Sequence, residues 1–226
     1  MSREADQFRS QMRHSLDRTT TRASAIMVAR HTSVYSAGDD GEMVYFIDHG
    51  QIKLTKPSPR GGECLLAVYT AGDVFGELSL SGAPSRLNTA MAMEATLLKQ
   101  MPSYKFLDLL KADSTLREFI SYLALRITDQ QVAIANLVTA GCEQRLGQAL
   151  LHLSRKHGQH GQRDQRRKTR GLRISQQELS RMVGTTRPRI GGFMQRFRDM
   201  GLLEMSSGHY MIVKENKLAA YLASIT

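Results

Sequence analysis

The spacing of apolar residues changes near Pro102, and this change limits the folds open to the chain. Before that point, short apolar runs are separated by Gly, Asp and Pro; they lie at 43–47, 51–54, 64–69 and 95–101. Short strands with a turn every 8–12 residues or so predict a β-barrel or sandwich, here over 31–103. After Pro102 the apolar period becomes that of a helix, so we expect an α+β chain.

The expected helix at 104–138 carries a narrow apolar stripe. Its members are separated alternately by four and three positions: Leu116, Ile120, Leu123, Ile127, Gln130, Ile134 and Leu137. An a/d-only stripe is typical of a helix–helix seam, whose natural partner is a second copy of the chain. We therefore expect a homodimer through 116–137, the alternative being a helix packed on its own domain. Gln130 either fixes the register of the seam or faces a polar group at the dimer axis.

The positive charge is concentrated in the last 88 residues. Residues 1–138 hold 15 Lys and Arg against 15 Asp and Glu, whereas residues 139–226 hold 16 against 6, which gives the whole net charge of +10. This division predicts two domains, the second facing a polyanion such as nucleic acid; the alternative is a solvated basic surface. Residues 155–173, with eight Lys and Arg and one Asp, are expected to form a basic connector.

Several classes of protein are excluded by what the sequence lacks. No run approaches the roughly 18 apolar residues of a membrane span, and no signal-peptide core is present, so we expect a cytoplasmic protein with no membrane partner. Two cysteines, Cys64 and Cys142, are too few for a four-cysteine zinc site or iron–sulfur cluster, and we expect no metal. Neither a nucleophile elbow nor a Walker loop occurs, so we expect no enzyme. Residues 1–30, with six arginines and no clear apolar stripe, are expected to be a helical or irregular lead-in.

Residues 174–200 are the most specific segment and predict a helix-turn-helix. Ser175 and Glu178 have the spacing of a capping box, and Gly184 supplies the turn. Thr185 or Thr186 caps the second helix, with Pro188 in its first turn. We expect a small core formed by Leu179, Val183, Ile190 and Phe193, with Ser180 where the helices cross.

The following segment, 201–213, is expected to form a hairpin wing, which makes 139–226 a winged helix-turn-helix DNA-binding domain. The second helix of such a motif presents its first residues to base edges in the major groove, while other polar residues hold phosphates. The candidate DNA-binding residues are Gln176, Thr185, Thr186, Arg187, Arg189, Gly192, Gln195 and Arg196.

A second candidate site lies at 73–96. Gly76 and Glu77 follow an expected strand, and Arg86 comes nine residues after the glutamate. Glycine permits close approach of the backbone to a ligand, amides at the start of a short helical turn suit a phosphate, and arginine binds phosphate with paired hydrogen bonds. Glutamate accepts a hydrogen bond from a sugar hydroxyl.

In order, the expected parts are a β-barrel, the Gly-Glu…Arg spacing, a long dimer helix and a winged helix-turn-helix. This order resembles the cyclic-AMP receptor protein/fumarate–nitrate regulator superfamily of bacterial transcription factors, over nearly all of the chain beyond residue 30. The resemblance implies a cyclic-nucleotide-binding-like jelly-roll barrel, a cyclic AMP or cyclic GMP effector, a dyad-symmetric DNA site, and RNA polymerase as a further partner. It also implies these effector-binding residues: Phe75, Gly76, Glu77, Leu78, Ser79, Arg86, Leu87, Asn88, Arg126, Gln130 and Gln131.

The chain departs from the pattern of the cyclic-nucleotide binders in this superfamily. Leu87 stands where they have Ser or Thr, and Gln130 and Gln131 replace a Thr-Ser pair that contacts adenine. On the recognition helix, Pro188 replaces a common glutamate and Gly192 an arginine. Two readings therefore stay open: a regulator gated by a small effector, and a DNA-binding regulator whose barrel takes no cyclic nucleotide. The cysteine cluster of the redox-sensing branch is absent, and we expect no haem.

Overall fold

The computed structural model describes residues 3–18, 23–58, 61–160, 172–206 and 210–225. The chain divides into two compact units, one formed by residues 1–62 and 66–132 and the other by residues 63–65 and 133–226. Among the described residues, no helix has the length and apolar character to span a membrane. Much of the expected basic connector, residues 161–171, lies outside the described residues.

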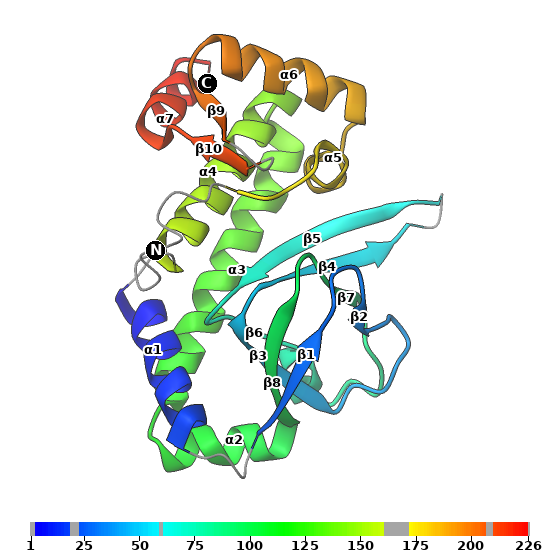
Figure 1. The fold of residues 1–226 in the computed structure, drawn as a ribbon, viewed down its shortest axis with the longest axis vertical. Coiled ribbons are helices and arrows are strands. Elements are labelled where there is room, and N and C mark those ends of the chain that lie inside the picture. The colour runs from blue at the N-terminus through cyan, green and yellow to red at the C-terminus, as the bar shows by residue number, and fades with distance from the viewer. Residues whose placement is uncertain (1–2, 19–22, 59–60, 161–171, 207–209, 226) are drawn as a thin grey trace. The chain divides into compact units, whose positions relative to one another are not determined.

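The first unit contains two antiparallel four-stranded sheets (Figure 1). One has the order β1-β8-β3-β6 and the other β2-β7-β4-β5. Their strands are β1 (Ser24–Val28), β2 (Ser33–Tyr35), β3 (Met43–His49), β4 (Gln51–Pro57), β5 (Glu63–Thr70), β6 (Val74–Phe75), β7 (Thr89–Ala92) and β8 (Thr96–Pro102). The four apolar runs of the sequence thus form β3, β4, β5 and β8, but the sheet begins at Ser24, earlier than the expected boundary at residue 31.

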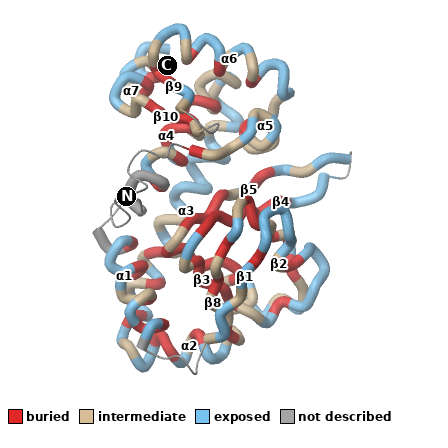
Figure 2. The backbone as a smooth tube through the Cα atoms, in the orientation of Figure 1, coloured by how far each residue is buried: buried red, intermediate tan, exposed pale blue. Residues whose placement is uncertain are grey.

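The sheet that contains β3 is covered on both faces at this strand, which explains why β3 begins with a continuous apolar run, 43–47. Successive side chains of a strand point to opposite faces. Tyr45 and Ile47 pack in the core between the two sheets, whereas Val44 and Phe46 pack in a second core with the helices. Figure 2 shows β3 as largely buried.

The N-terminal segment corrects the expectation of a lead-in without an apolar stripe. Residues Arg3–Arg18 form helix α1, and its side chains Ala5, Phe8, Met12 and Leu16 are all buried. These positions recur at helical spacing and lie in the same core as residues of β3, α2 and α3. Four of the six arginines of residues 1–30 lie in α1 among these apolar residues, so the helix is amphipathic.

The expected helix at 104–138 is two helices, α2 (Ser103–Ala112) and α3 (Leu116–Thr139). The chain turns between them at Ser114, which has φ +53°. Phe119 and Tyr122 of α3 are buried in the first unit. Most of the heptad stripe is exposed in the single chain, namely Leu116, Ile120, Ile127, Gln130, Ile134 and Leu137.

The second unit contains α4 (Cys142–His160), α5 (Gln176–Val183), α6 (Arg187–Asp199), the strands β9 (Leu203–Ser206) and β10 (Tyr210–Val213), and α7 (Glu215–Ser224). Strands β9 and β10 pair antiparallel with Val213 opposite Leu203, as expected of a wing. The turn of this hairpin, 207–209, lies outside the described residues. Helices α5 and α6 are the two helices of the helix-turn-helix.

The core between α5 and α6 differs from the expectation at one position. Leu179, Val183 and Ile190 are buried as expected, and so is Ser180. Phe193 is only half-buried, so its assignment to the core was wrong. Met194 and Phe197 occupy the core instead, because they lie on the face of α6 that Ile190 shares, four and seven residues further along.

Candidate functional site

The short helical turn η1 (Glu77–Ser81) begins at a glycine whose missing side chain shapes the site. Gly76 has φ +79°, in the left-handed region that favours glycine. A Cβ at this position would lie 2.8 Å from the Met43 carbonyl oxygen and 3.0 Å from Arg86 Nη1. The glycine therefore allows the Arg86 guanidinium to lie directly against the backbone where the turn begins.

Arg86 is buried, only 6% exposed, and its guanidinium is held by backbone oxygens. Nη1 donates to the Gly76 carbonyl at 3.1 Å and Nη2 to the Met43 carbonyl at 2.5 Å. The Tyr35 ring lies beneath the guanidinium, with 4.3 Å between the guanidinium carbon and the ring centre. Burial raises the pKa of the Tyr35 phenol above its usual value, although the Arg86 charge opposes this shift. The ring thus stays neutral beneath the cation.

A small cavity adjoins Arg86 and the η1 turn. It encloses about 20 Å³, which is enough for one water molecule, since a water needs roughly 10–15 Å³. Three of its lining residues each have a buried polar atom with no hydrogen-bond partner among the described residues: Arg86 Nε, Glu77 Oε2 and Ser79 Oγ. The lining residues are Tyr35, Gly41, Leu54, Gly76, Glu77, Leu78, Ser79, Ala83, Ser85, Arg86, Leu87 and Asn88.

Glu77 connects this cavity to α3. Its Oε1 accepts a hydrogen bond from Arg126 Nη2 at 2.9 Å, and the side chains are only 12% and 15% exposed respectively. Arg126 also donates to the Tyr69 hydroxyl and, through Nη1, to the Val74 carbonyl at 3.1 Å. Burial lowers the pKa of Arg126, but Tyr122, Tyr69 and Glu77 outweigh that effect, so the pKa is raised overall. Arg126 is therefore a permanent cation beside the cavity.

The structure brings together most, but not all, of the residues proposed for an effector site. Gly76, Glu77, Leu78, Ser79, Arg86, Leu87 and Asn88 line one cavity. Arg126 does not line this cavity but donates a hydrogen bond to Glu77, which does. Phe75 is fully buried and stacked on Tyr45, outside the lining. Gln130 and Gln131 are exposed on α3 and do not line the cavity of the single chain.

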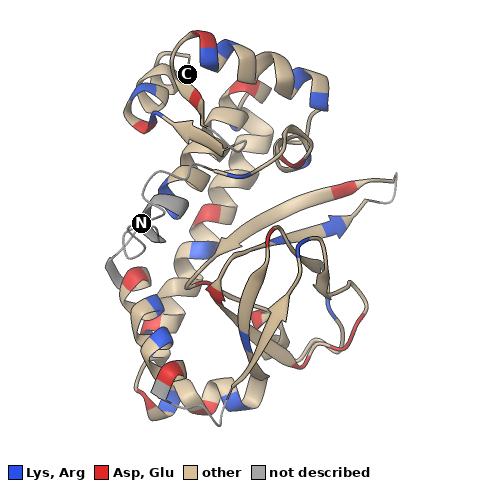
Figure 3. Ribbon diagram, in the orientation of Figure 1, with Lys and Arg blue, Asp and Glu red and all other residues tan. Residues whose placement is uncertain are grey.

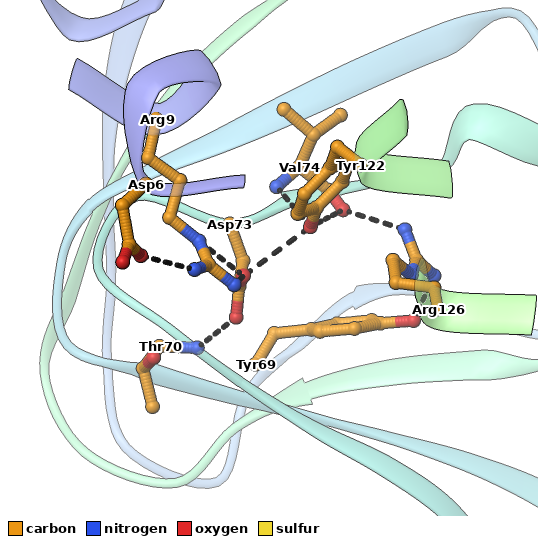
Figure 4. A network of polar contacts seen from close by, with 8 residues as sticks. All are labelled: Asp6, Arg9, Tyr69, Thr70, Asp73, Val74, Tyr122 and Arg126. Atoms are coloured by element: carbon orange, nitrogen blue, oxygen red, sulfur yellow. Dashed lines mark hydrogen bonds and ion pairs between the residues drawn. The ribbon is translucent and has the colours of Figure 1, made fainter. Parts of the chain in front are cut away.

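Sequence reasoning missed the aromatic and acidic residues around this site. Tyr35 lines the cavity, and Asp73 lies at the centre of a polar network that includes Arg9, Tyr122 and Arg126 (Figure 4). The only sequence signal for Asp73 was a charged residue between two apolar strands. That signal does not reveal a partner 64 positions away.

The second candidate site is the helix-turn-helix. Ser175 and Glu178 form the expected capping box at the start of α5, and Gly184 ends that helix with φ +72°. Thr186 is the N-cap of α6 and is followed by Arg187 and Pro188 in the first turn. Local sequence signals thus determine both the end of one helix and the start of the next.

The first turn of α6 presents exposed positive charge. Arg187 and Arg189 are exposed and form no ion pair with any residue in the described part of the chain. Thr186 and Gly192 are exposed as well, while Thr185 and Gln176 are half-buried. Basic residues recur along α6 (Figure 3).

The second half of α6 is restrained by neighbouring acids. Arg196 Nη1 lies 3.0 Å from Glu143 Oε2, and the other oxygen of Glu143 accepts from the Tyr221 hydroxyl at 2.6 Å. Gln195 donates to Asp199 at 2.7 Å. Of the proposed DNA contacts, Arg187 and Arg189 are therefore the cations most available to an external ligand.

Two family models match the two units described above. Residues 26–113 match the cyclic nucleotide-binding domain, and residues 144–221 match the Crp-like helix-turn-helix domain. The chain belongs to the CRP/FNR superfamily of bacterial transcription regulators. It is thus a regulator with a cyclic nucleotide-binding domain and a DNA-binding helix-turn-helix, and this family is one of transcription regulators, not of enzymes.

Relatives from both branches of the CRP/FNR superfamily resemble the chain. It is 26% identical over 196 residues, 84% of each chain, to the CRP-like cAMP-activated global transcriptional regulator of Mycobacterium tuberculosis. It is 25% identical over 200 residues to the fumarate and nitrate reduction regulatory protein of Escherichia coli, covering 88% of this chain and 78% of that one. Among solved structures, FixK2 from Bradyrhizobium japonicum has the same fold, with a TM-score of 0.72 at 17% identity over 88% of this chain and 96% of that one.

Proposed function

We propose that this regulator acts as a homodimer, binds a dyad-symmetric DNA site, and is gated by a cyclic nucleotide or a similar small anion in the barrel. Effector binding shifts the population toward the arrangement in which both recognition helices fit successive major grooves. The proposed compartment is the cytoplasm, and the proposed further partner is RNA polymerase.

The observation that carries the effector proposal is the set of unpartnered polar atoms around one cavity. Arg86 Nε is a donor, Glu77 Oε2 an acceptor and Ser79 Oγ both, and all three are buried. Buried polar groups are normally hydrogen-bonded, because an unmet partner costs about 1–3 kcal/mol. A ligand with an anionic group and a hydroxyl would satisfy all three atoms at once.

Calorimetric titration with cyclic AMP and cyclic GMP tests this proposal. We expect binding by the wild-type chain and its loss in Arg86→Ala, because the substitution removes the cation at the cavity. The matched control is Arg30→Ala, which removes another arginine of the barrel that donates to a carbonyl, that of Met93, outside the cavity. Equal binding by wild type and Arg86→Ala would contradict a site at this cavity.

A second function is favoured by the small size of the cavity. About 20 Å³ of space lies beside an arginine whose two terminal nitrogens already donate to carbonyls. Pockets for small molecules are usually some 300–1,000 Å³. This observation favours a regulator whose barrel is filled by its own side chains and whose DNA binding needs no effector. DNA binding of equal affinity with and without cyclic nucleotide, together with a blank titration, would support this alternative.

The exposed stripe of α3 supports the dimer, and the exposed arginines in the first turn of α6 support DNA binding. Half-sites about one helical turn apart, roughly 34 Å, are the expected target of two symmetric recognition helices. Selection of bound duplexes from a random library would reveal that spacing. Affinity for the selected duplex should fall steeply between about 50 and 200 mM salt, since phosphate neutralisation releases counterions. A flat salt response would contradict DNA binding.

A further inference from the structure

Asp73 is the centre of a polar network between α1, the barrel and α3 (Figure 4). It is completely buried, in the turn between β5 and β6. Its Oδ1 accepts from Arg9 Nε at 3.2 Å, from Arg9 Nη2 at 3.0 Å and from the Tyr122 hydroxyl at 3.2 Å. Its Oδ2 accepts from the Thr70 N–H at 2.9 Å. One carboxylate thus joins two helices that are distant in sequence.

The Arg9–Asp73 pair is a buried ion pair, and each partner depends on the other. The Arg9 side chain is 9% exposed. Burial lowers its pKa, but the charge of Asp73 and the smaller effects of Tyr122, of the hydrogen bond to Asp73 and of Asp6 together outweigh this, so the pKa is raised overall. Burial, followed by the Asp73 charge, raises the pKa of Tyr122, so that side chain remains a neutral hydrogen-bond donor. Removing one member of a buried pair leaves the other charge uncompensated in the protein interior.

From Tyr122 the network continues to the cavity through one backbone residue. The Val74 N–H donates to the Tyr122 oxygen at 3.3 Å, and the Val74 carbonyl accepts from Arg126 at 3.1 Å. Tyr122 and Arg126 lie one helical turn apart on α3, so they bond the N–H and the carbonyl of the same residue, which belong to successive peptide units. Arg126 then donates to Glu77, which lines the cavity.

We propose that Asp73 is a positioning residue for the effector site, through which the N-terminal helix α1 controls where Arg126 and Glu77 lie. Arg9 fixes Asp73, and Asp73 orients Tyr122. Tyr122 then fixes the register of α3 against Val74, two residues before the first lining residue of this segment, Gly76. Helix α1 is then part of the sensing element, although none of its described residues lines the cavity. The proposal extends the proposed effector site, but its first test uses no effector.

Helix α1 also offers a matched control, because it is attached to the barrel by a second ion pair. Arg13 lies 2.7 Å from Asp48, with side chains 34% and 22% exposed. Neither residue contacts Asp73, Tyr122 or Arg126 in any described interaction. Arg13→Met therefore loosens α1 without interrupting the network, whereas Arg9→Met interrupts it.

Hydrogen–deuterium exchange of the full-length protein without ligand gives the deciding measurement. In Arg9→Met we expect the amides of 74–81, which include η1, to exchange about fivefold faster, the factor that loss of one hydrogen bond produces. Tyr122→Phe, which keeps the aromatic ring beside Phe8, should have the same effect, because the Val74 N–H loses its acceptor. Arg13→Met should leave exchange in 74–81 unchanged. If Arg9→Met alone does not fold, the same exchange measurement is made on the double variant Arg9→Met/Asp73→Asn, which removes both charges.

Two outcomes would overturn the proposal. One is exchange in 74–81 that matches wild type in both Arg9→Met and Tyr122→Phe. The other is the same acceleration in Arg13→Met, which would mean that any loosening of α1 is enough. A cyclic AMP titration is the second arm: where the wild type binds, Arg9→Met should bind more weakly and Arg13→Met equally well. A blank titration for the wild type would count against cyclic AMP as effector, while the exchange result would still decide the role of Asp73.

Discussion

The Arg126 guanidinium lies 2.9 Å from the Glu77 carboxylate, and both side chains are largely buried. Breaking a buried pair by removing one partner leaves an uncompensated charge, so we expect Arg126→Met to lower the free energy of unfolding by about 3 kcal/mol. Arg126→Met/Glu77→Gln should cost clearly less than the sum of the two single variants, because neither charge is then left alone. Urea unfolding followed by circular dichroism measures all four proteins.

The surface pair Arg13–Asp48 is the control for this cycle, since it is more exposed. Arg13→Met should cost no more than about 1 kcal/mol. Strict additivity of the Arg126 and Glu77 substitutions would mean that the two side chains do not interact in solution.

Dimerisation through α3 predicts that a charge has different effects at two residues that are almost equally exposed. Ile127 belongs to the heptad stripe and is 54% exposed, while Val132 lies off the stripe and is 55% exposed. A charge in an apolar seam is strongly unfavourable, so Ile127→Glu should convert the dimer to monomer at micromolar concentration. Val132→Glu should leave the dimer intact. Sedimentation velocity measures both, and an unchanged sedimentation coefficient for Ile127→Glu would exclude this seam.

Arg187 is expected to contact a base edge because it is exposed in the first turn of α6. Arg187→Ala should weaken binding to the selected duplex by about 1–3 kcal/mol and relax the preference at one base pair of each half-site. The control Lys217→Ala removes an exposed positive charge from α7. Its smaller loss should be equal across all sequences. Fluorescence anisotropy on single-base variants distinguishes the two patterns.

The parts of the chain that were predicted well are those whose signals are local. The capping box of Ser175 and Glu178, the turn at Gly184 and the proline in the first turn of α6 each act within a few residues. The left-handed backbone at Gly76, which begins the η1 turn, is likewise a local signal. For these elements the chain itself contains the physical cause of the structure.

The network around Asp73 was not predictable in the same way. Arg9 and Asp73 are 64 positions apart, and Tyr122 is 49 positions beyond Asp73. No periodicity connects such residues, because their contact depends on how the helices pack on the sheet. The apolar stripe of α1 is a different case, because its residues recur at helical spacing and the sequence alone contains that signal.

Gly76 should be the least replaceable glycine of the site. Its φ of +79° disfavours any L side chain, and a Cβ would lie 2.8 Å from the Met43 carbonyl oxygen. We expect Gly76→Ala to lower the free energy of unfolding by at least about 1–3 kcal/mol, the usual cost of a strained backbone. Gly82→Ala is the control, since its φ is +77° but nothing lies within 4 Å of the added Cβ. If Gly76→Ala lowers the free energy of unfolding more than Gly82→Ala does, the difference measures the close contact separately from the backbone strain. Equal losses of stability would contradict a contribution from the contact.

Buried phenols predict how stability changes in alkali. Burial raises the pKa of Tyr122, Tyr35 and Tyr69 above the value of 10 expected in the unfolded chain. Above pH 10 the unfolded state therefore holds fewer protons than the folded state, and the free energy of unfolding falls as the pH rises toward the folded pKa. This contribution is present in full below pH 10.

Tyr122→Phe removes one of these phenols, so its free energy of unfolding should fall less steeply with pH than that of wild type. Full titration of one such group changes the slope by about 1.4 kcal/mol per pH unit. Urea unfolding at a series of pH values between about 8 and 11 measures the slopes. Tyr104→Phe, which removes an exposed phenol from the same unit, controls for the substitution itself. Identical slopes for Tyr122→Phe and wild type would mean that the Tyr122 hydroxyl is not held neutral by burial and by the charge of Asp73.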